Sequence, residues 1–194
     1  MTDSPVLEGL LVPGAAFTVA ELYAMALDGV LTAVFGQAFR PVGVPESPAL
    51  RAAALAQHAP AALAGRAALG GLAAAWIHGC APPPRTPVAL LVASGHRTTA
   101  LPANSGCVLH EVRLDPYDVE RLGGALVTNA LRTARDVAMY APEGEARAVL
   151  AAIAATPSLA CPLGRIRTAI AVAAHVPGKR RAQALLDAMI APRA

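Results

Sequence analysis

Residues 107–140, CVLHEVRLDPYDVERLGGALVTNALRTARDVAMY, decide the fold, because short turns in this stretch join elements of different periodicity. The first element has a two-residue period, which is typical of a strand with one buried face. The residues on that face are Val108, His110, Val112 and Leu114. Pro116 cannot donate a backbone hydrogen bond, so the strand ends there, and Asp115 is expected to cap a turn or helix over Tyr117 to Arg121.

The second half of the stretch predicts a strand followed by a helix. Gly123 and Gly124 interrupt any helix, and Leu126-Val127 indicates a short strand. Thr128 or Asn129 is placed to cap the next helix, in which apolar residues recur three and four positions apart. These residues are Leu131, Ala134, Val137 and Ala138. Arg132 and Asp136 stand four apart on that helix, and we expect them, like Thr128 and Asn129, to have structural roles.

The same residues carry a family resemblance. The run R-L-x-P-x-D-V is followed by L-G-G-x-x-V-T-x-x-L-R-T-A-x-D-V-A, and A-A-W-I-H-G precedes both at Ala74 to Gly79. Over roughly residues 66 to 190 the chain resembles the AbiEi-type family of actinobacterial proteins, which are antitoxins of type IV toxin–antitoxin systems. The resemblance implies a DNA-binding transcriptional regulator that represses its own operon and counters a nucleotidyltransferase-like toxin.

The resemblance also implies an organisation, with an N-terminal winged helix followed by a larger antitoxin domain. Longer relatives continue into a nuclease-like domain, whereas this chain stops at Arg193-Ala194, so we expect no appended catalytic domain. Composition agrees with a non-membrane α+β protein. Hydrophobic residues make up 55% of the 194 residues but aromatic residues only 4%, so the core is expected to consist of Leu, Val and Ala.

Residues 1–45 predict a small winged-helix-like module. Thr18 and Glu21 form a capping box that opens VAELYAMAL, and the helix places its apolar residues on one face. That face comprises Val19, Leu22, Tyr23, Ala26 and Leu27. Two short apolar runs then flank Gly36-Gln37, which predicts a hairpin, with Arg40 on the wing. A short helix around Val6 to Leu11 is the most that the preceding residues are expected to form.

Residues 46–194 predict a mixed domain with a short sheet and several helices. Ser47-Pro48 starts a helix that runs to about His58, and Gly65 to Trp76 is expected to form a second. Prolines then enforce an extended linker into a strand at Val88 to Val92. Three helices are predicted at the end of the chain, at Glu143–Ala154, Leu163–Ala174 and Gly178–Ile190. Two to four strands and six or more helices make the expected fold class α+β.

Charge is distributed unevenly along the chain. Residues 1–50 hold one Arg against five acidic residues, a net charge of −4, while residues 51–194 hold fifteen basic residues against eight acidic ones, a net charge of +7. The first turn of the last helix carries three cations, although a helix N-terminus disfavours positive charge. Two explanations are open, a solvated surface turn and an anion site that the preceding helix would widen, and we expect the strongest positive potential of the chain to lie here. With Arg40, the candidate nucleic-acid-binding residues are Arg165, Arg167, Lys179, Arg180 and Arg181.

Catalytic and metal chemistry are not expected. Cys107 and His110 stand three apart on a strand and point to opposite faces, so they cannot share a zinc ion, and no cofactor motif is present. Ser94-Gly95-His96 offers a nucleophile and a base in one loop, but without the strand-to-helix elbow of a hydrolase. Three scattered cysteines indicate a reducing cytoplasm, and no apolar run reaches the roughly 18 residues that span a bilayer.

Two functions remain open at this point. The first is a DNA-binding regulator of the antitoxin type, whose partners are DNA and a toxin or other protein. The alternative is a non-enzymatic protein-interaction module that has lost DNA recognition. The predicted groove-facing helix, Val19 to Leu27, carries no Arg or Lys, and phosphate contacts dominate affinity for DNA, which is why the alternative is kept.

Overall fold

The computed structural model describes residues 9–95, 101, 105–173 and 176–191. They form the α-helices α1 (Val19–Leu27), α2 (Pro48–Ala56), α3 (Gly71–Ile77), α4 (Ala130–Tyr140), α5 (Glu143–Ala155), α6 (Leu163–Val172) and α7 (Lys179–Ile190). The strands are β1 (Leu31–Phe35), β2 (Ala38–Pro41), β3 (Ala68–Leu69), β4 (Val88–Ala93), β5 (Cys107–Val112), β6 (Val119–Leu122) and β7 (Ala125–Thr128). Three short 3-10 turns complete the set: η1 (Ala61–Leu63), η2 (Pro116–Asp118) and η3 (Pro157–Leu159). The predicted α+β class is confirmed, with more strands than the two to four expected.

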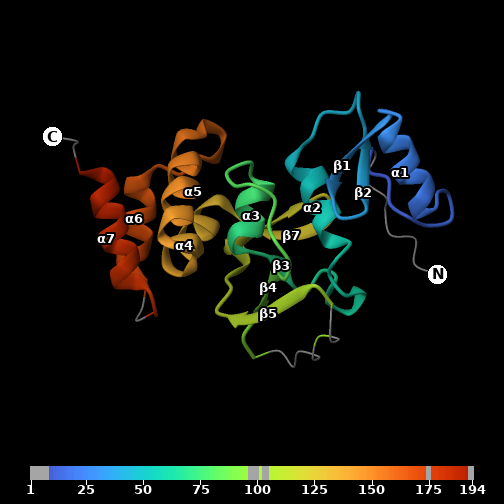
Figure 1. The fold of residues 1–194 in the computed structure, drawn as a ribbon. Helices are drawn as coiled ribbons and strands as arrows, with labels where there is room; N and C mark the ends of the chain where they lie inside the picture. The colour runs from blue at the N-terminus through green and yellow to red at the C-terminus, as the bar shows by residue number, and fades with distance from the viewer. Residues whose placement is uncertain (1–8, 96–100, 102–104, 174–175, 192–194) are drawn as a thin grey trace.

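The strands form two sheets. β1 and β2 pair as an antiparallel hairpin, and the other five pair in the order β5-β4-β3-β7-β6. In the larger sheet β3 runs parallel to β7 and antiparallel to β4, while β4 and β5 are parallel. Figure 1 shows this sheet in the middle of the molecule, with α1 and the hairpin at one end and α4 to α7 at the other.

The central stretch contains one strand that the sequence did not predict. Residues Val119–Leu122 form β6 instead of a turn or helix, and only Pro116–Asp118 forms the turn that Asp115 caps. Gly123 and Gly124 have φ angles of +54° and +83° and join β6 to β7, which is the two-residue hairpin turn that positive φ values favour. A Cβ atom on Gly123 would lie 2.0 Å from the backbone oxygen of Ala49, so this turn packs directly on α2.

The helix predicted at Gly65 to Trp76 is wrong in its first half. Ala68–Leu69 forms β3, which lies in the middle of the larger sheet between β4 and β7. Gly70 is extended and Gly71 has a φ of +57°, so the chain turns sharply before α3 begins. The helix ends at Ile77, one residue after the predicted end at Trp76, and Trp76 itself is buried.

Helix α1 and the β1–β2 hairpin form the predicted helix-plus-hairpin arrangement, here called the helix–hairpin module. The capping box of Thr18 and Glu21 is present. The module also includes a bridge that the sequence did not indicate: Leu11 pairs with Phe39 through two backbone hydrogen bonds of 2.8 Å. Residues 6–8 of the short helix expected at Val6 to Leu11 lie outside the described residues.

The expected apolar face of α1 is not a buried face. Within α1 only Leu22 is buried, because it packs with Leu31 and Phe39 in a small core of the module. Val19 is 36%, Tyr23 47% and Leu27 89% exposed. A two-stranded hairpin is too small to cover both apolar sides of the helix, so one side faces solvent.

Three groups of apolar side chains stabilise the fold. The central one joins the larger sheet, α2 and α3 to Val34 and Ala38 of the hairpin, so packing continues across residue 45, where the sequence predicted a domain boundary. Phe35 adds to this contact, with its ring centroid 5.6 Å from that of Trp76. A second group joins α4 to α7 and extends to Ala75 of α3 and to Cys80, which follows α3. The third is the small core of the helix–hairpin module.

The three predicted C-terminal helices are confirmed as α5, α6 and α7, each within two residues of its expected bounds. No helix in the described part of the chain is by itself long and apolar enough to cross a membrane. Residues Glu143–Ala155 and Pro157–Val172 pass that test only together, across a bend of 87°.

Candidate functional site

Arg40, the cation predicted on the wing, lies on β2 and bends back onto its own chain. Its guanidinium donates to the backbone oxygen of Val44 at 2.6 Å and, more weakly, to the oxygens of Pro41 and Val42 at 3.4 Å. Its Nε atom is buried without a hydrogen-bond partner. The side chain therefore holds the segment that follows the hairpin, and its charge is partly directed inward.

Three of the five C-terminal candidates donate hydrogen bonds to backbone oxygens where helices or 3-10 turns end. Lys179 Nζ donates to the backbone oxygens of Ala171 and Ala173, at 2.7 and 2.6 Å, at the C-terminus of α6. Arg181 donates to the oxygen of Ala141, which follows α4. Arg165 donates to the oxygen of Ala160 at 2.7 Å. A helix C-terminus exposes free carbonyl groups and carries the negative end of the dipole, so Lys179 and Arg181 are favourably placed.

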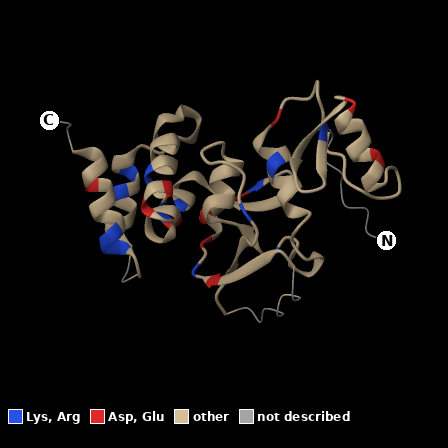
Figure 2. Ribbon diagram, viewed as in Figure 1, with Lys and Arg blue, Asp and Glu red and all other residues tan. Residues whose placement is uncertain are grey.

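The remaining two candidates differ from each other. Arg167 forms an ion pair with Asp187 at 2.5 Å, and both side chains are about half exposed. Arg180 is exposed and makes no hydrogen bond or ion pair with any described residue. Because α6 and α7 form an antiparallel hairpin, Arg167 lies beside the second half of α7, away from Lys179. Figure 2 shows the basic residues of these helices in separate groups along the two helices. The structure thus divides the predicted patch.

Helix α4 carries a buried ionic network that the sequence revealed only in part. Arg132 Nε donates to both carboxylate oxygens of Asp136, at 3.0 and 2.9 Å. Its terminal nitrogen donates to Asp118 at 2.6 Å and to the backbone oxygen of Arg113 at 2.9 Å. We call these four groups the Arg132 network. It ties α4 to the segment between β5 and β6. Asp118 was not predicted, although its position three residues after Asp115 in a capping box is visible in the sequence.

The caps of α4 complete this network. Asn129 accepts a hydrogen bond from the backbone of Arg132 at 2.9 Å and donates to the oxygen of Tyr117 at 2.6 Å. Thr128 and Thr133 are fully buried, and their hydroxyl groups lie 2.7 Å apart. Each of the residues Thr128, Asn129, Arg132 and Asp136 has a hydrogen-bond partner inside the molecule, which supports the structural roles predicted for them.

Burial and charge oppose each other in the Arg132 network. Burial acts to lower the pKa of Arg132, but the charges and hydrogen bonds of Asp136 and Asp118 outweigh it, so the pKa is raised and the guanidinium stays charged. Burial raises the pKa of Asp136, and Arg132 offsets only part of that effect. The ion pair is therefore costly to bury and depends on its geometry.

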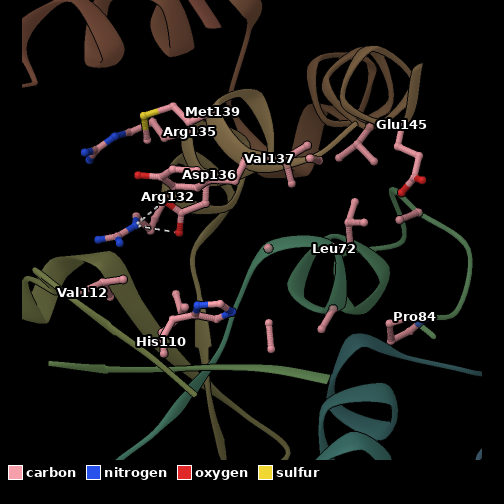
Figure 3. A pocket seen from close by; sticks show the side chains of 18 of the residues that line it. Leu72, Pro84, His110, Val112, Arg132, Arg135, Asp136, Val137, Met139 and Glu145 are labelled. Atoms are coloured by element: carbon pink, nitrogen blue, oxygen red, sulfur yellow. Dashed lines mark hydrogen bonds and ion pairs between the residues drawn. The ribbon is translucent and has the colours of Figure 1, made fainter. Parts of the chain in front are cut away.

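A cleft of about 1720 Å³ lies beside the network, between β4, β5 and α3 on one side and α4 and α5 on the other. Figure 3 shows His110 on β5 across this cleft from Asp136, while Leu72 and Pro84 supply apolar lining farther along. The two carboxylates of the network, Asp118 and Asp136, are already paired with Arg132. Neither is therefore free to act as a base toward His110. The described residues contain no group of three side chains placed to hold a metal ion. Ser94 follows β4 in a turn, and His96 lies outside the described residues.

The most exposed apolar surface lies on the helix–hairpin module. Val30 and Val42, which are 56% and 55% exposed, adjoin each other at the open end of the hairpin, where the backbone of Val42 donates to Val30 at 3.1 Å. Val30 in turn donates to the oxygen of Met25, which places it at the C-terminal end of α1. We call these two residues, together with the exposed apolar residues of α1, the apolar strip. Its members are Val19, Tyr23, Leu27, Val30 and Val42.

The charges around the apolar strip are acidic. Glu21 lies on α1 and Asp28 is its C-cap, and the ribbon of this helix in Figure 2 carries acidic but no basic positions. The hydrogen bonds from Thr18 lower the pKa of Glu21, so it stays ionised at neutral pH. The sequence did not predict this surface, because it placed Val19, Tyr23 and Leu27 on the buried face of the helix together with Leu22.

The chain matches no known protein-family model and no curated protein.

Proposed function

We propose that this chain is a non-enzymatic regulator of the antitoxin type that acts by binding a protein through its helix–hairpin module. The apolar strip is the observation that carries the proposal. Five of the nine large apolar side chains that are exposed in the described residues belong to it. Exposed apolar side chains that gather on one part of a soluble protein are a mark of an interaction site.

The chemistry of the strip indicates what kind of protein surface fits it. Its centre is apolar, and the charged residues that α1 and its C-cap carry, Glu21 and Asp28, are both acidic. Arg40, the module's one basic residue, is directed to the backbone oxygen of Val44. A partner with an apolar ridge and basic residues at its rim is therefore complementary. In a toxin–antitoxin pair this partner is the toxin.

DNA binding is the second candidate, and one observation favours it. Leu11 pairs with β2, β2 pairs with β1, and α1 precedes the hairpin, which is the order of elements in the second half of a winged helix. Against it, the exposed side of α1 offers no cation to phosphate. Of the six residues predicted to contact nucleic acid, Arg180 is the one without an intramolecular partner among the described residues.

The role proposed here is cytoplasmic. Cys80, Cys107 and Cys161 are free, and burial raises the pKa of each thiol, which suits proteins kept in a reducing compartment.

A direct comparison of the two ligands tests the proposal. We expect the purified chain to bind the protein encoded by the neighbouring gene in calorimetry, and Leu27→Glu to weaken this binding at least tenfold. Val172→Glu is the matched control, because Val172 is 79% exposed on α6, far along the chain from the strip. Equal binding by wild type and Leu27→Glu would remove the proposal.

The DNA arm uses fluorescence anisotropy with a duplex from upstream of the gene, measured at several salt concentrations. We expect weak binding without preference over an unrelated duplex. Specific binding that Arg40→Ala reduces for all sequences alike, with a salt slope lower by about one unit, would establish the second candidate instead.

A further inference from the structure

We infer that the cleft between the larger sheet and helices α4 and α5 binds a small organic monoanion, an apolar chain or ring that ends in one carboxylate, and that Arg135 holds the carboxylate. The cleft shares no residue with the apolar strip, so the inference does not depend on the protein partner proposed above. Its volume of about 1720 Å³ exceeds the roughly 300–1,000 Å³ of common ligand pockets, so there is room for such a molecule.

The two ends of the cleft differ in chemistry. Figure 3 shows Arg135, Asp136 and His110 at one end, here called the network end, and Leu72, Pro84 and Glu145 toward the other, here called the proline end. The network end adjoins the C-terminus of β5, because Arg132 donates to the backbone oxygen of Arg113, which directly follows that strand. A ligand with one polar group is therefore expected to place it at the network end.

Arg135 is the donor at the network end that the fold leaves unused. Its Nε atom is buried and has no hydrogen-bond partner among the described residues. Its terminal nitrogen lies 3.9 Å from Asp118 Oδ1, which is too far for a hydrogen bond. A buried donor without an acceptor is unfavourable, so an acceptor that enters the cleft beside Arg135 gains from a cost already present in the folded chain.

The carboxylates at the same end already have donors. Asp136 accepts from Arg132 with both oxygens, and Asp118 accepts from Arg132 and from the backbone of Asp115. The side chain of Asp115 in turn accepts from the backbone of Tyr117. The free hydrogen-bonding capacity of the network end is thus mainly that of donors, and an anion is complementary to it.

The other two carboxylates that line the cleft are directed elsewhere. Glu111 stands between His110 and Val112 on β5, so the alternation of a strand directs its side chain to the opposite face of the sheet. Glu145 lies toward the proline end (Figure 3). Neither residue therefore places a negative charge beside Arg135.

Two further donors line the cleft near Arg135. Burial and the charge of Asp136 raise the pKa of Tyr140, although Arg132 and Arg135 act to lower it, so the hydroxyl keeps its proton and can donate. His110 supplies at least one ring N–H. Arg135 and two such donors suit a carboxylate, which carries one negative charge and pairs with a guanidinium. A phosphate monoester carries about −1.5 to −2 and would need a second free cation.

Calorimetry with octanoate and octanol tests the inference, because the two probes share a chain and differ in the charged group. We expect one octanoate per chain, bound at least tenfold more tightly than octanol. Hexanoate is expected to bind more weakly than octanoate by about fourfold for each methylene removed, because the chain lies against apolar lining. Equal binding of octanoate and octanol, or no binding of octanoate, would overturn the inference.

Variants of the cleft locate the two parts of the ligand. Arg135→Leu is expected to remove the preference for octanoate while octanol still binds, which also reports that the variant is folded. Arg135→Lys keeps the charge but not the planar fork and should retain part of the preference. Arg147→Leu, on the surface of α5 outside the cleft, is the matched control and should bind both probes as the wild type does.

A second pair of variants separates the cleft from the apolar strip. Ala148 is exposed and lines the cleft, so Ala148→Phe should fill part of it and weaken both probes at least tenfold. Leu27→Glu should leave both affinities unchanged. Octanoate binding that survives both Arg135→Leu and Ala148→Phe would place the probe outside the cleft and overturn the inference. So would a cleft that takes a peptide with a free carboxyl terminus but no octanoate, because its occupant would then be a protein.

Discussion

Helices α1 and α4 both hold residues where their chemistry is unfavourable, α1 by exposing apolar side chains and α4 by burying charged ones. In α4 each buried charge has partners within the molecule: Arg132 contacts Asp118 and Asp136. In α1 the exposed Leu27 and Tyr23 leave apolar surface in solvent. Contacts within the folded chain explain the buried charges of α4. No such contact explains the exposed apolar side chains of α1, so a binding partner is the explanation we propose for them. Buried charge therefore points to structure here, and exposed apolar surface points to binding.

The largest effect is expected from removing the cation of the Arg132 network. Arg132→Met keeps much of the side-chain volume but leaves Asp136 buried without its counter-charge, so we expect the free energy of unfolding to fall by about 3–5 kcal/mol. Urea unfolding followed by circular dichroism measures it. Arg147→Met is the control, because Arg147 pairs with Glu143 on the surface of α5 and should change stability by less than about 0.5 kcal/mol. A loss for Arg132→Met no larger than the control's would show that the network is not stabilising.

The features that sequence predicts well in this chain are local ones. Thr18 caps α1, Ser47 caps α2 and Asn129 caps α4 through hydrogen bonds that reach only three residues along the chain. The residue types that make such bonds are recognisable from spacing alone. For the same reason the i, i+4 pair of Arg132 and Asp136 was visible before the structure.

Features that depend on distant residues were missed. Ala68–Leu69 becomes a strand only because β4 and β7 flank it, and neither is near in sequence. Lys179 opens α7 in sequence, yet its contacts are with the end of α6, which only the packing of the two helices determines. Likewise the hydrophobic period of α1 located a helix but not the side on which the hairpin would lie.

A smaller loss of stability is expected from Asp136→Asn. The amide keeps an acceptor for Arg132 Nε but leaves the guanidinium with one carboxylate, Asp118, so we expect about 1–3 kcal/mol lower stability. Partner binding should be unchanged at temperatures where the variant stays folded. A folded, stable Asp136→Asn variant that no longer binds the partner would show that Asp136 has a role in binding. The contrast between α4 and α1 would then be wrong.

Lys179, at the start of α7, is expected to stabilise the folded chain. Its position in the sequence, at a helix N-terminus, predicted the opposite. Lys179→Met removes two hydrogen bonds to the carbonyl groups of Ala171 and Ala173, so we expect the unfolding free energy to fall by about 0.5–1.5 kcal/mol. Arg180→Met, one residue later and without such a bond to the described residues, should change it by less than about 0.5 kcal/mol. Thermal unfolding of the two variants side by side measures the difference. Equal stability would show that the helix-end contact contributes nothing.

The smallest change in stability is expected where the largest change in binding is proposed. Leu27 is 89% exposed, so Leu27→Gln removes almost no buried area and should alter the unfolding free energy by less than about 0.5 kcal/mol. Leu22, five residues earlier on the same helix, is fully buried, and Leu22→Ala should cost about 2–5 kcal/mol. Because the two leucines lie on the same helix, comparing them distinguishes the side of α1 that packs in the core from the side proposed to bind the partner. Unfolding curves together with calorimetry of partner binding test both sides at once. A substantial loss of stability in Leu27→Gln would mean that the strip is covered within the chain itself, and the case for an external occupant would fall with it.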